Sequence, residues 1–135
     1  MSDMIVTTSS MGVKESVDRI EKMLSESDWI ATEFPVIYRI DLGKYASKAK
    51  FTLQSELLMF DYPNMWGFLM DENPAIGIEW PLKVVAWQDE QGCTRVGYSN
   101  PKMLVERYKI KRHTFEIECI ENLMENIIAG LTDDM

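Results

Sequence analysis

Carboxylates are the side chains of this sequence that most readily suggest chemistry, because 22 of the 135 residues are acidic and only one is histidine. Acid–base catalysis by carboxyl groups needs two of them in one pocket with separated pKa values. The acids of the central region are scattered and fall mostly in expected turns: Asp61, Asp71, Glu72, Glu79, Asp89 and Glu90. Because the sequence alone does not place any two of them in one pocket, we assign no catalytic residue.

Histidine and cysteine add no metal or nucleophile pattern. His113 lies in a basic run before an expected helix, where we predict an exposed loop residue and not a member of a catalytic triad. The spacing of Cys93 and Cys119 suggests neither a redox pair nor a zinc pair. The sequence also lacks GxSxG, P-loop, GxGxxG and HExxH motifs. We therefore predict no metal site and no cofactor.

Methionine and aromatic side chains form the most distinctive group, and they concentrate between residues 56 and 101. Methionine adapts its shape, and an aromatic-lined cleft is the usual form of a small-molecule pocket. We predict a ligand groove in which the loop over residues 62–70 lies near Trp80 and Tyr98. The residues predicted to line it are Tyr62, Met65, Trp66, Phe68, Met70, Trp80 and Tyr98. Core packing or a subunit interface would explain the same residues and stays open as an alternative.

Length and charge limit the classes of partner. A chain of 135 residues is expected to form one domain. No apolar run approaches the roughly 18 residues that span a membrane, and the N-terminus lacks a signal-peptide pattern, so we expect a cytoplasmic protein without membrane contact. The net charge of −8 opposes binding to phosphate backbones. We expect no nucleic-acid partner, and we interpret the basic run at residues 107–113 as local charge balance or a site for an acidic partner.

The elements that would position these residues follow from periodicity. Alternating or β-branched stretches predict strands over 3–8, 34–41, 57–60, 82–88 and 93–98, with residues 76–80 also extended. Apolar residues at helical spacing predict helices over 12–25, 101–108 and 114–131, and a short lysine-bearing helix over 43–50. Those lysines indicate a solvated face, with a small anion site as the alternative.

The strands at 82–88 and 93–98 are predicted to form a hairpin. Gly92 is the natural residue for a positive φ in the connecting turn. If paired residue numbers sum to 181, Val85 lies opposite Val96 and Trp87 opposite Thr94. That pairing predicts that Val85, Trp87, Val96 and Tyr98 pack under the helices, although a one-residue bulge would exchange the faces.

Spaced apolar, proline and glycine positions between residues 57 and 101 resemble a known family pattern. The matching residues are Phe60, Pro63, Leu69, Met70, Pro74, Pro81, Leu82, Lys83, Asp89, Gly92, Tyr98 and Pro101, with Ile40 and Asp41 upstream. On these residues the chain resembles the domain-of-unknown-function 302 family. Trp66, Gly67 and Phe68 depart from it, because they stand where the family usually has Gly, Thr and Pro.

The resemblance implies an α+β fold. It implies a curved antiparallel sheet with helices packed on one face, in the β-α-β4-α order of TATA-binding-protein-like proteins, and a long C-terminal helix extends past the matched region. It also suggests a homodimer and implies no reaction. We therefore hypothesise a homodimeric binding or interaction module with a groove for a small apolar ligand. The alternatives are an enzyme that uses loop carboxylates, such as Asp61 with Tyr98, and a purely structural assembly partner.

Overall fold

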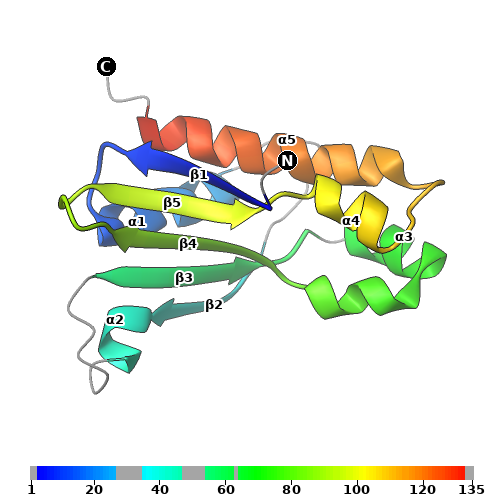
Figure 1. Ribbon diagram of the computed structural model, residues 1–135, viewed down its shortest axis with the longest axis horizontal. Helices are drawn as coiled ribbons and strands as arrows, with labels where there is room; N and C mark the ends of the chain where they lie inside the picture. Colours follow the sequence, from blue (N-terminus) through cyan, green and yellow to red (C-terminus); the bar gives the residue numbers. More distant parts are fainter. Residues whose placement is uncertain (1–2, 27–34, 47–53, 63, 133–135) are drawn as a thin grey trace.

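The protein is an α+β fold built on one five-stranded antiparallel sheet with strand order β1-β5-β4-β3-β2 (Figure 1). The computed structural model describes residues 3–26, 35–46, 54–62 and 64–132. The strands are β1 (Met4–Ser9), β2 (Val36–Asp41), β3 (Ser55–Phe60), β4 (Leu82–Gln88) and β5 (Thr94–Ser99). The helices are α1 (Val13–Ser25), α2 (Leu42–Tyr45), α3 (Met65–Glu72), the 3-10 helix η3 (Pro74–Glu79), α4 (Lys102–Arg107) and α5 (Thr114–Thr132). The predicted β-α-β4-α order is confirmed, with short helices added in the connections.

Helices α1 and α5 cover one face of the sheet and pack against each other (Figure 1). Their apolar stripes, predicted from 3.6-residue periodicity, are buried against the strands. The largest fully buried side chains are Phe60, Ile20, Leu58, Leu69, Ile76, Ile117, Ile120, Met124, Leu131, Val17, Val84 and Val96. Most of them come from these two helices and from β3, β4 and β5, so the core lies between the helices and the sheet.

No helix in the described part of the chain combines the length and the hydropathy that crossing a membrane requires.

The opposite face of the sheet carries apolar side chains that none of the described helices covers. Along one row of the register, Val6 pairs with Gly97, Gly97 with Val85, and Val85 with Leu57. We define the open sheet face by the apolar side chains that alternate with the buried ones: Met4, Val6, Tyr38, Ile40, Leu57, Met59, Val85 and Trp87. Val6 is 45% exposed and Tyr38 55% exposed, so this face presents hydrocarbon to solvent.

The β4–β5 hairpin shows that the predicted register was wrong by one residue. Val85 lies opposite Gly97 and Ala86 opposite Val96, so paired numbers sum to 182. The turn explains the difference: Asp89 N–H donates to the Cys93 carbonyl at 2.8 Å, so Asp89 belongs to the ladder and the loop has an odd number of residues. Gly92, with φ +82°, supplies the left-handed residue typical of such a loop.

This register corrects the predicted faces of β4. Val84 and Ala86 are fully buried under the helices, while Val85 and Trp87 lie on the open sheet face. On β5 the expected burial of Val96 is confirmed. A one-residue change exchanges every side chain of a strand between the two faces, which is why a single loop residue decides what the sheet presents to solvent.

Two segments expected to be irregular or extended are helical. Residues 76–80 were predicted to be extended, but η3 runs through Glu79, because the Asn73 side chain accepts the Ala75 N–H at 3.1 Å and Pro74 presets the first turn. The predicted loop over 62–70 forms helix α3 from Met65 onward. The predicted helix over 43–50 is present as α2, and its part after Ala46 lies outside the described residues.

Candidate functional site

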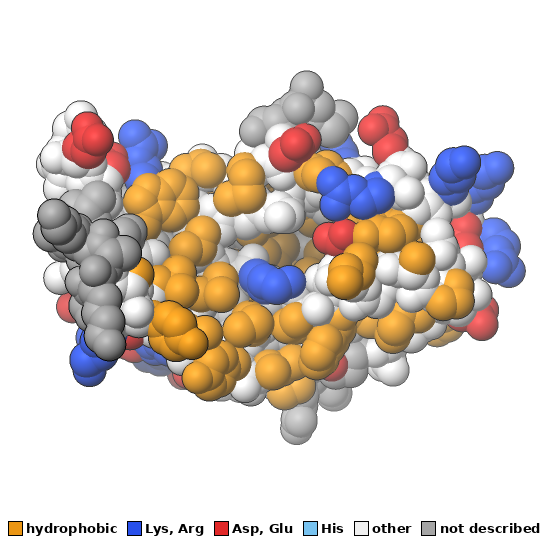
Figure 2. All heavy atoms as spheres, turned by 60° about the horizontal axis from the view of Figure 1, so that its bottom comes forward, with side chains coloured by type: hydrophobic (Ala, Val, Ile, Leu, Met, Phe, Trp, Pro, Cys, Tyr) orange, Lys and Arg blue, Asp and Glu red, His pale blue; other side chains and the backbone are white. Residues whose placement is uncertain are grey.

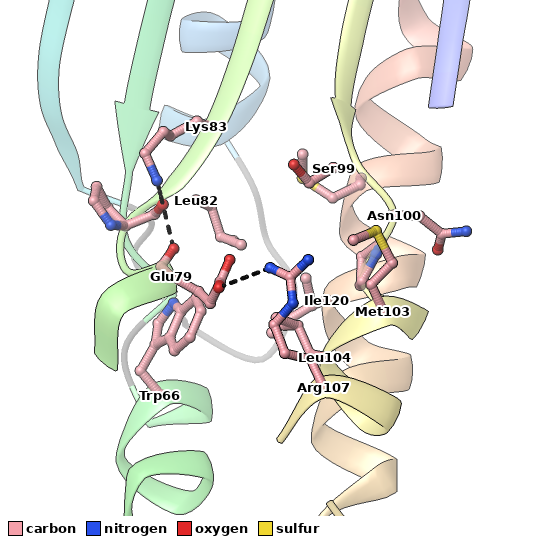
Figure 3. Close-up of a pocket in the computed structure, with 13 residues that line it drawn as sticks. Trp66, Glu79, Leu82, Lys83, Ser99, Asn100, Met103, Leu104, Arg107 and Ile120 are labelled. Atoms are coloured by element: carbon pink, nitrogen blue, oxygen red, sulfur yellow. Dashed lines mark hydrogen bonds and ion pairs between the residues drawn. The ribbon is translucent and has the colours of Figure 1, made fainter. Parts of the chain in front are cut away.

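A pocket of about 100 Å³ opens where the end of β5 and the start of β4 meet the short helices. Figure 2 shows a hollow in the surface, with apolar side chains around it and charged side chains at its edge. Figure 3 shows that α3, η3, β4, α4 and α5 each contribute to the pocket. It is lined by Trp66, Glu79, Pro81, Leu82, Lys83, Ser99, Asn100, Pro101, Met103, Leu104, Arg107, Ile120 and Met124.

The lining separates into an apolar interior and a polar rim. Trp66, Leu104, Ile120 and Met124 are buried and supply hydrocarbon to the interior. The polar residues are Glu79, Lys83, Ser99, Asn100 and Arg107, and the charged ones among them are not buried. An apolar cavity with a few polar groups at its edge is the common form of a small-molecule site.

Among the described residues, Trp66 of the pocket lining carries the one buried side-chain nitrogen or oxygen atom that has no hydrogen-bond partner. Its side chain is 3% exposed, and no acceptor among the described residues reaches Nε1. In Figure 3 the indole rises from α3, with its nitrogen at the end away from the helix and on the side of Glu79. A buried N–H without an acceptor costs about 1–3 kcal/mol, so the pocket holds a donor that is stabilised when an acceptor arrives.

Glu79 links two residues of the α4 region at the pocket rim. Its Oε2 lies 3.2 Å from Arg107 Nη1 and also accepts the Tyr108 hydroxyl (Figure 3 shows the Arg107 contact). The carboxylate raises the pKa of the Arg107 guanidinium and the pKa of the Tyr108 phenol, in each case chiefly through the side-chain hydrogen bond. Glu79 therefore neutralises Arg107 and ties η3 to α4.

Lys83 differs from Arg107 in having no carboxylate partner among the described residues. Its Nζ donates to the carbonyl oxygens of Pro81 at 3.0 Å and Glu79 at 3.5 Å. These contacts orient the ammonium group but leave its charge unbalanced. The charged residues that line the pocket are Glu79, Lys83 and Arg107, and Glu79 forms an ion pair with Arg107. The positive charge of Lys83 is therefore not balanced by another lining residue.

The segments around the pocket are held together by side chains that bind backbone. The Asn73 amide donates to the Tyr108 carbonyl at 3.0 Å, which joins the α3–η3 junction to the end of α4. The Glu72 carboxylate accepts the N–H groups of Lys111, Arg112 and His113, at 2.6, 3.2 and 3.1 Å. These backbone bonds, led by that of Lys111, lower the pKa of Glu72. The end of the basic run, residues 111–113, thus binds a carboxylate of its own chain through backbone N–H groups.

The structure brings one of the seven predicted groove residues, Trp66, into the pocket. Tyr98 is 3% exposed and belongs to the core, where burial raises the pKa of its phenol. Tyr62 and Met65 are half-buried and pack against the core. The remaining three, Phe68, Met70 and Trp80, are exposed and do not line the pocket.

The exposed aromatic residues have local contacts outside the pocket. Trp80 Nε1 donates to Asp61 Oδ1 at 2.8 Å, and the Phe68 ring lies 5.6 Å from the His113 ring. Because Asp61 is bound to Trp80 and Tyr98 is in the core, the structure does not bring the Asp61–Tyr98 pair together in the pocket. Among the described residues there is no cluster of His, Cys, Asp and Glu that could hold a metal ion.

Sequence reasoning missed most of the lining residues. Glu79 was named only among scattered acids and Arg107 only within the basic run, while Lys83 was counted as a family match and not as a site residue. Their chain separation hides their proximity, since Glu79 and Arg107 are 28 positions apart. The signal that pointed to the pocket was Trp66, a large residue at a position where the resembled pattern has Gly.

Comparison with known proteins finds a family model and a solved structure that carry the same family description. A family model described as "Domain of unknown function DUF302" matches residues 5–131. The crystal structure of an uncharacterized conserved protein DUF302 from Bacillus stearothermophilus superposes with a TM-score of 0.83 at 20% identity, covering 97% of this chain and 99% of that one.

Two curated relatives are proteins named fluoride-specific ion channel FluC 1. The protein from Brucella suis biovar 1 (strain 1330) is 26% identical over 110 residues, which is 81% of this chain and 41% of that protein. The protein from Brucella abortus biovar 1 (strain 9-941) has the same identity over 110 residues, which is 39% of its length. The chain thus spans about two fifths of the curated relatives that it matches.

Proposed function

This chain belongs to the DUF302 family, and we propose that it is a binding module that holds a small molecule in the pocket at Trp66. The observation that carries this proposal is the buried indole N–H of Trp66, a residue of the pocket lining, which has no acceptor among the described residues. A ligand with an oxygen acceptor would satisfy that donor, while its hydrocarbon part would contact the apolar interior.

Water is a weaker occupant for this position. A stably buried water makes about three hydrogen bonds to polar groups. The buried residues beside Trp66 in the pocket, Leu104, Ile120 and Met124, offer hydrocarbon side chains. A ligand that presents one acceptor and an apolar body matches this lining better than water does.

An enzyme that works through paired carboxylates receives less support. Glu79 is the one carboxylate among the lining residues, and Arg107 and Tyr108 both bind it. A general acid and base need two groups with separated pKa values, or one group near the reacting atom together with a partner. Glu79 is better placed to hold the pocket wall than to exchange protons.

The second part of the proposal is that two copies of the chain associate through the open sheet face. From ordinary strand spacing and rise, five strands of six or seven residues measure roughly 24 by 20 Å. Side-chain relief makes the accessible area larger than this projection, so the face approaches the roughly 800 Å² that each partner gives to a standard interface. Exposed Val6 and Tyr38 lie on it, and a self-complementary apolar face suits a two-fold dimer.

The ion-channel activity named for the Brucella relatives is not carried over to this chain, because the match covers about two fifths of their length. Fluoride enters our proposal only as one small anion to be compared with others at the Trp66 N–H.

The proposal can be tested through the indole N–H signals of the protein. Four tryptophans give four such signals in a ¹H–¹⁵N NMR spectrum, and Trp66→Phe assigns the signal of interest while keeping an aromatic ring in the core. We would add acids, amides, amines and alcohols of up to about six non-hydrogen atoms, the size that a cavity near 100 Å³ accepts. Saturable shifts of the Trp66 signal support a binding module. A signal that no probe moves contradicts it and favours a purely structural protein.

A further inference from the structure

We infer that the ligand of this pocket is a small organic anion, a carboxylate on a short hydrocarbon chain, with Lys83 balancing its charge. This inference rests on the proposed binding function and adds the chemical class of the ligand. It depends on three properties of the pocket: the unbalanced ammonium at the rim, the donor without an acceptor inside, and the apolar lining between them.

The charge of the rim favours an anion although the protein as a whole is acidic. The net charge is −8, yet the charged residues that line the pocket are two cations and one carboxylate. Glu79 already pairs with Arg107 at 3.2 Å, whereas the contacts of Lys83 with the rest of the described chain are to backbone carbonyl oxygens. A cation ligand would therefore meet the unbalanced charge of Lys83, and an anion would neutralise it.

Hydrogen bonding favours a ligand that brings an acceptor to Trp66. Trp66 Nε1 can only donate, so a protonated ligand amine, which has no acceptor, would leave it without a partner. A carboxylate has two acceptor oxygens and forms stronger hydrogen bonds than a neutral carbonyl does. One oxygen can accept the indole N–H, and the charge of the group is then balanced by Lys83 at the rim.

Size and lining favour an organic anion over a bare inorganic ion. Leu82, Leu104 and Ile120 present hydrocarbon to the pocket, which a small hydrated ion would not contact. An apolar cavity of about 150 Å³ accommodates benzene, so a cavity near 100 Å³ accepts roughly four to six non-hydrogen atoms. Propionate, with five non-hydrogen atoms, is the probe of matching size and charge.

The test compares probes of nearly equal shape and different charge on the full chain. Sodium propionate, propionamide, propylamine hydrochloride and sodium fluoride are each titrated while the Trp66 indole N–H signal is followed by NMR. We expect propionate to bind about tenfold more tightly than propionamide, and propylamine to produce no saturable shift. We expect Lys83→Gln to weaken propionate binding about three- to tenfold, and Lys22→Gln, the same charge change on α1, to leave it unchanged.

The outcomes separate the ligand class from the binding function. Equal binding of propionate and propionamide, or unchanged propionate binding in Lys83→Gln, would overturn the anionic class while the pocket remained a binding site. Fluoride that shifts the Trp66 signal as strongly as propionate would overturn the organic part of the inference. The comparison of propionate with propionamide needs no variant, so it decides the question even where Lys83→Gln folds poorly. If all four probes and the broader probe set leave the signal unmoved, the proposed function itself fails.

Discussion

Arg107 Nη1 lies 3.2 Å from Glu79 Oε2, and this ion pair spans the rim of the pocket from α4 to the end of η3. The same carboxylate oxygen accepts the Tyr108 hydroxyl. Glu79 thus cancels one of the two cations of the pocket and leaves Lys83 to set its local charge. Removing the charge of Glu79 should therefore strengthen anion binding, whereas removing the charge of Lys83 should weaken it.

Replacing Glu79 by glutamine should strengthen anion binding. The amide oxygen of Glu79→Gln can still accept hydrogen bonds from Arg107 and Tyr108, but the rim gains one unit of positive charge. We expect propionate to bind about two- to fivefold more tightly, as measured by NMR titration of the Trp66 N–H at low ionic strength. Glu90→Gln, the same change in the exposed hairpin turn, serves as the control. Weaker binding in Glu79→Gln would show that the carboxylate itself contacts the ligand.

Replacing Glu72 by glutamine should lower stability and flatten its dependence on acid. The Glu72 carboxylate accepts three backbone N–H groups, and those bonds hold its pKa below the ordinary value near 4.3. A group whose pKa is lowered by folding stabilises the protein above its unfolded pKa. That contribution is lost as the pH falls through the folded pKa.

Melting temperatures measured by circular dichroism between pH 7 and pH 3 check this prediction. Glu72→Gln should melt lower than the parent protein at pH 7, and the difference should shrink below about pH 4. Asp71→Asn, at the exposed neighbouring position, should change little and serves as the control. A difference that stays constant across this pH range would exclude the carboxylate charge as the source of the stabilisation.

The hairpin turn requires glycine at one position. Gly92 has φ +82°, so Gly92→Ala places a side chain in the left-handed region and should lower the free energy of unfolding by about 1–2 kcal/mol. Gly67 is the matched control, because it lies in α3 and a Cβ there would meet no atom within 4 Å. Gly67→Ala should raise stability by about 0.5–1 kcal/mol. Urea unfolding measures both, and equal effects of the two substitutions would contradict the turn geometry.

A charge on the open sheet face should dissociate the proposed dimer. Val6 is 45% exposed at the centre of β1, and Val6→Glu would bring like charges together in a two-fold interface. We expect the parent protein to sediment as a dimer at micromolar concentration and Val6→Glu as a monomer. Ser25→Glu adds the same charge at the end of α1 and should leave the dimer intact. A parent protein that stays monomeric at all concentrations removes this part of the proposal.

The buried face of a single helix could be predicted from the sequence, but the pairing of two strands, which depends on the length of their connecting loop, could not. The stripe of Val13, Val17, Ile20 and Leu24 is buried as 3.6-residue spacing predicts. The hairpin strands were also located, but Asp89 joins the ladder and shifts the register by one residue. Spacing alone does not reveal that an acid at a strand end closes a loop with its own backbone.

The pocket was hidden for a related reason. The predicted helix over 101–108 follows an Asn–Pro pair and is present as α4. The identical Asn73–Pro74 pair begins η3, where residues 76–80 were predicted to be extended, so Glu79 was not placed on a helix. Helix α3 follows Asn64, which adopts φ 75° and makes no side-chain hydrogen bond at the N-cap, although Asn is a favoured N-cap residue. Because these segments meet only in three dimensions, the sequence indicated Trp66 but not its neighbours.

The most direct test of the binding proposal is a crystal structure of the protein grown with saturating propionate and inspected at Trp66. The account predicts density for the ligand with an oxygen about 2.7–3.2 Å from Trp66 Nε1, its carbon chain against Leu82 and Ile120, and its charge on the side of Lys83. A closed, dry pocket filled by its own side chains, with Nε1 bonded to a protein acceptor, would contradict it.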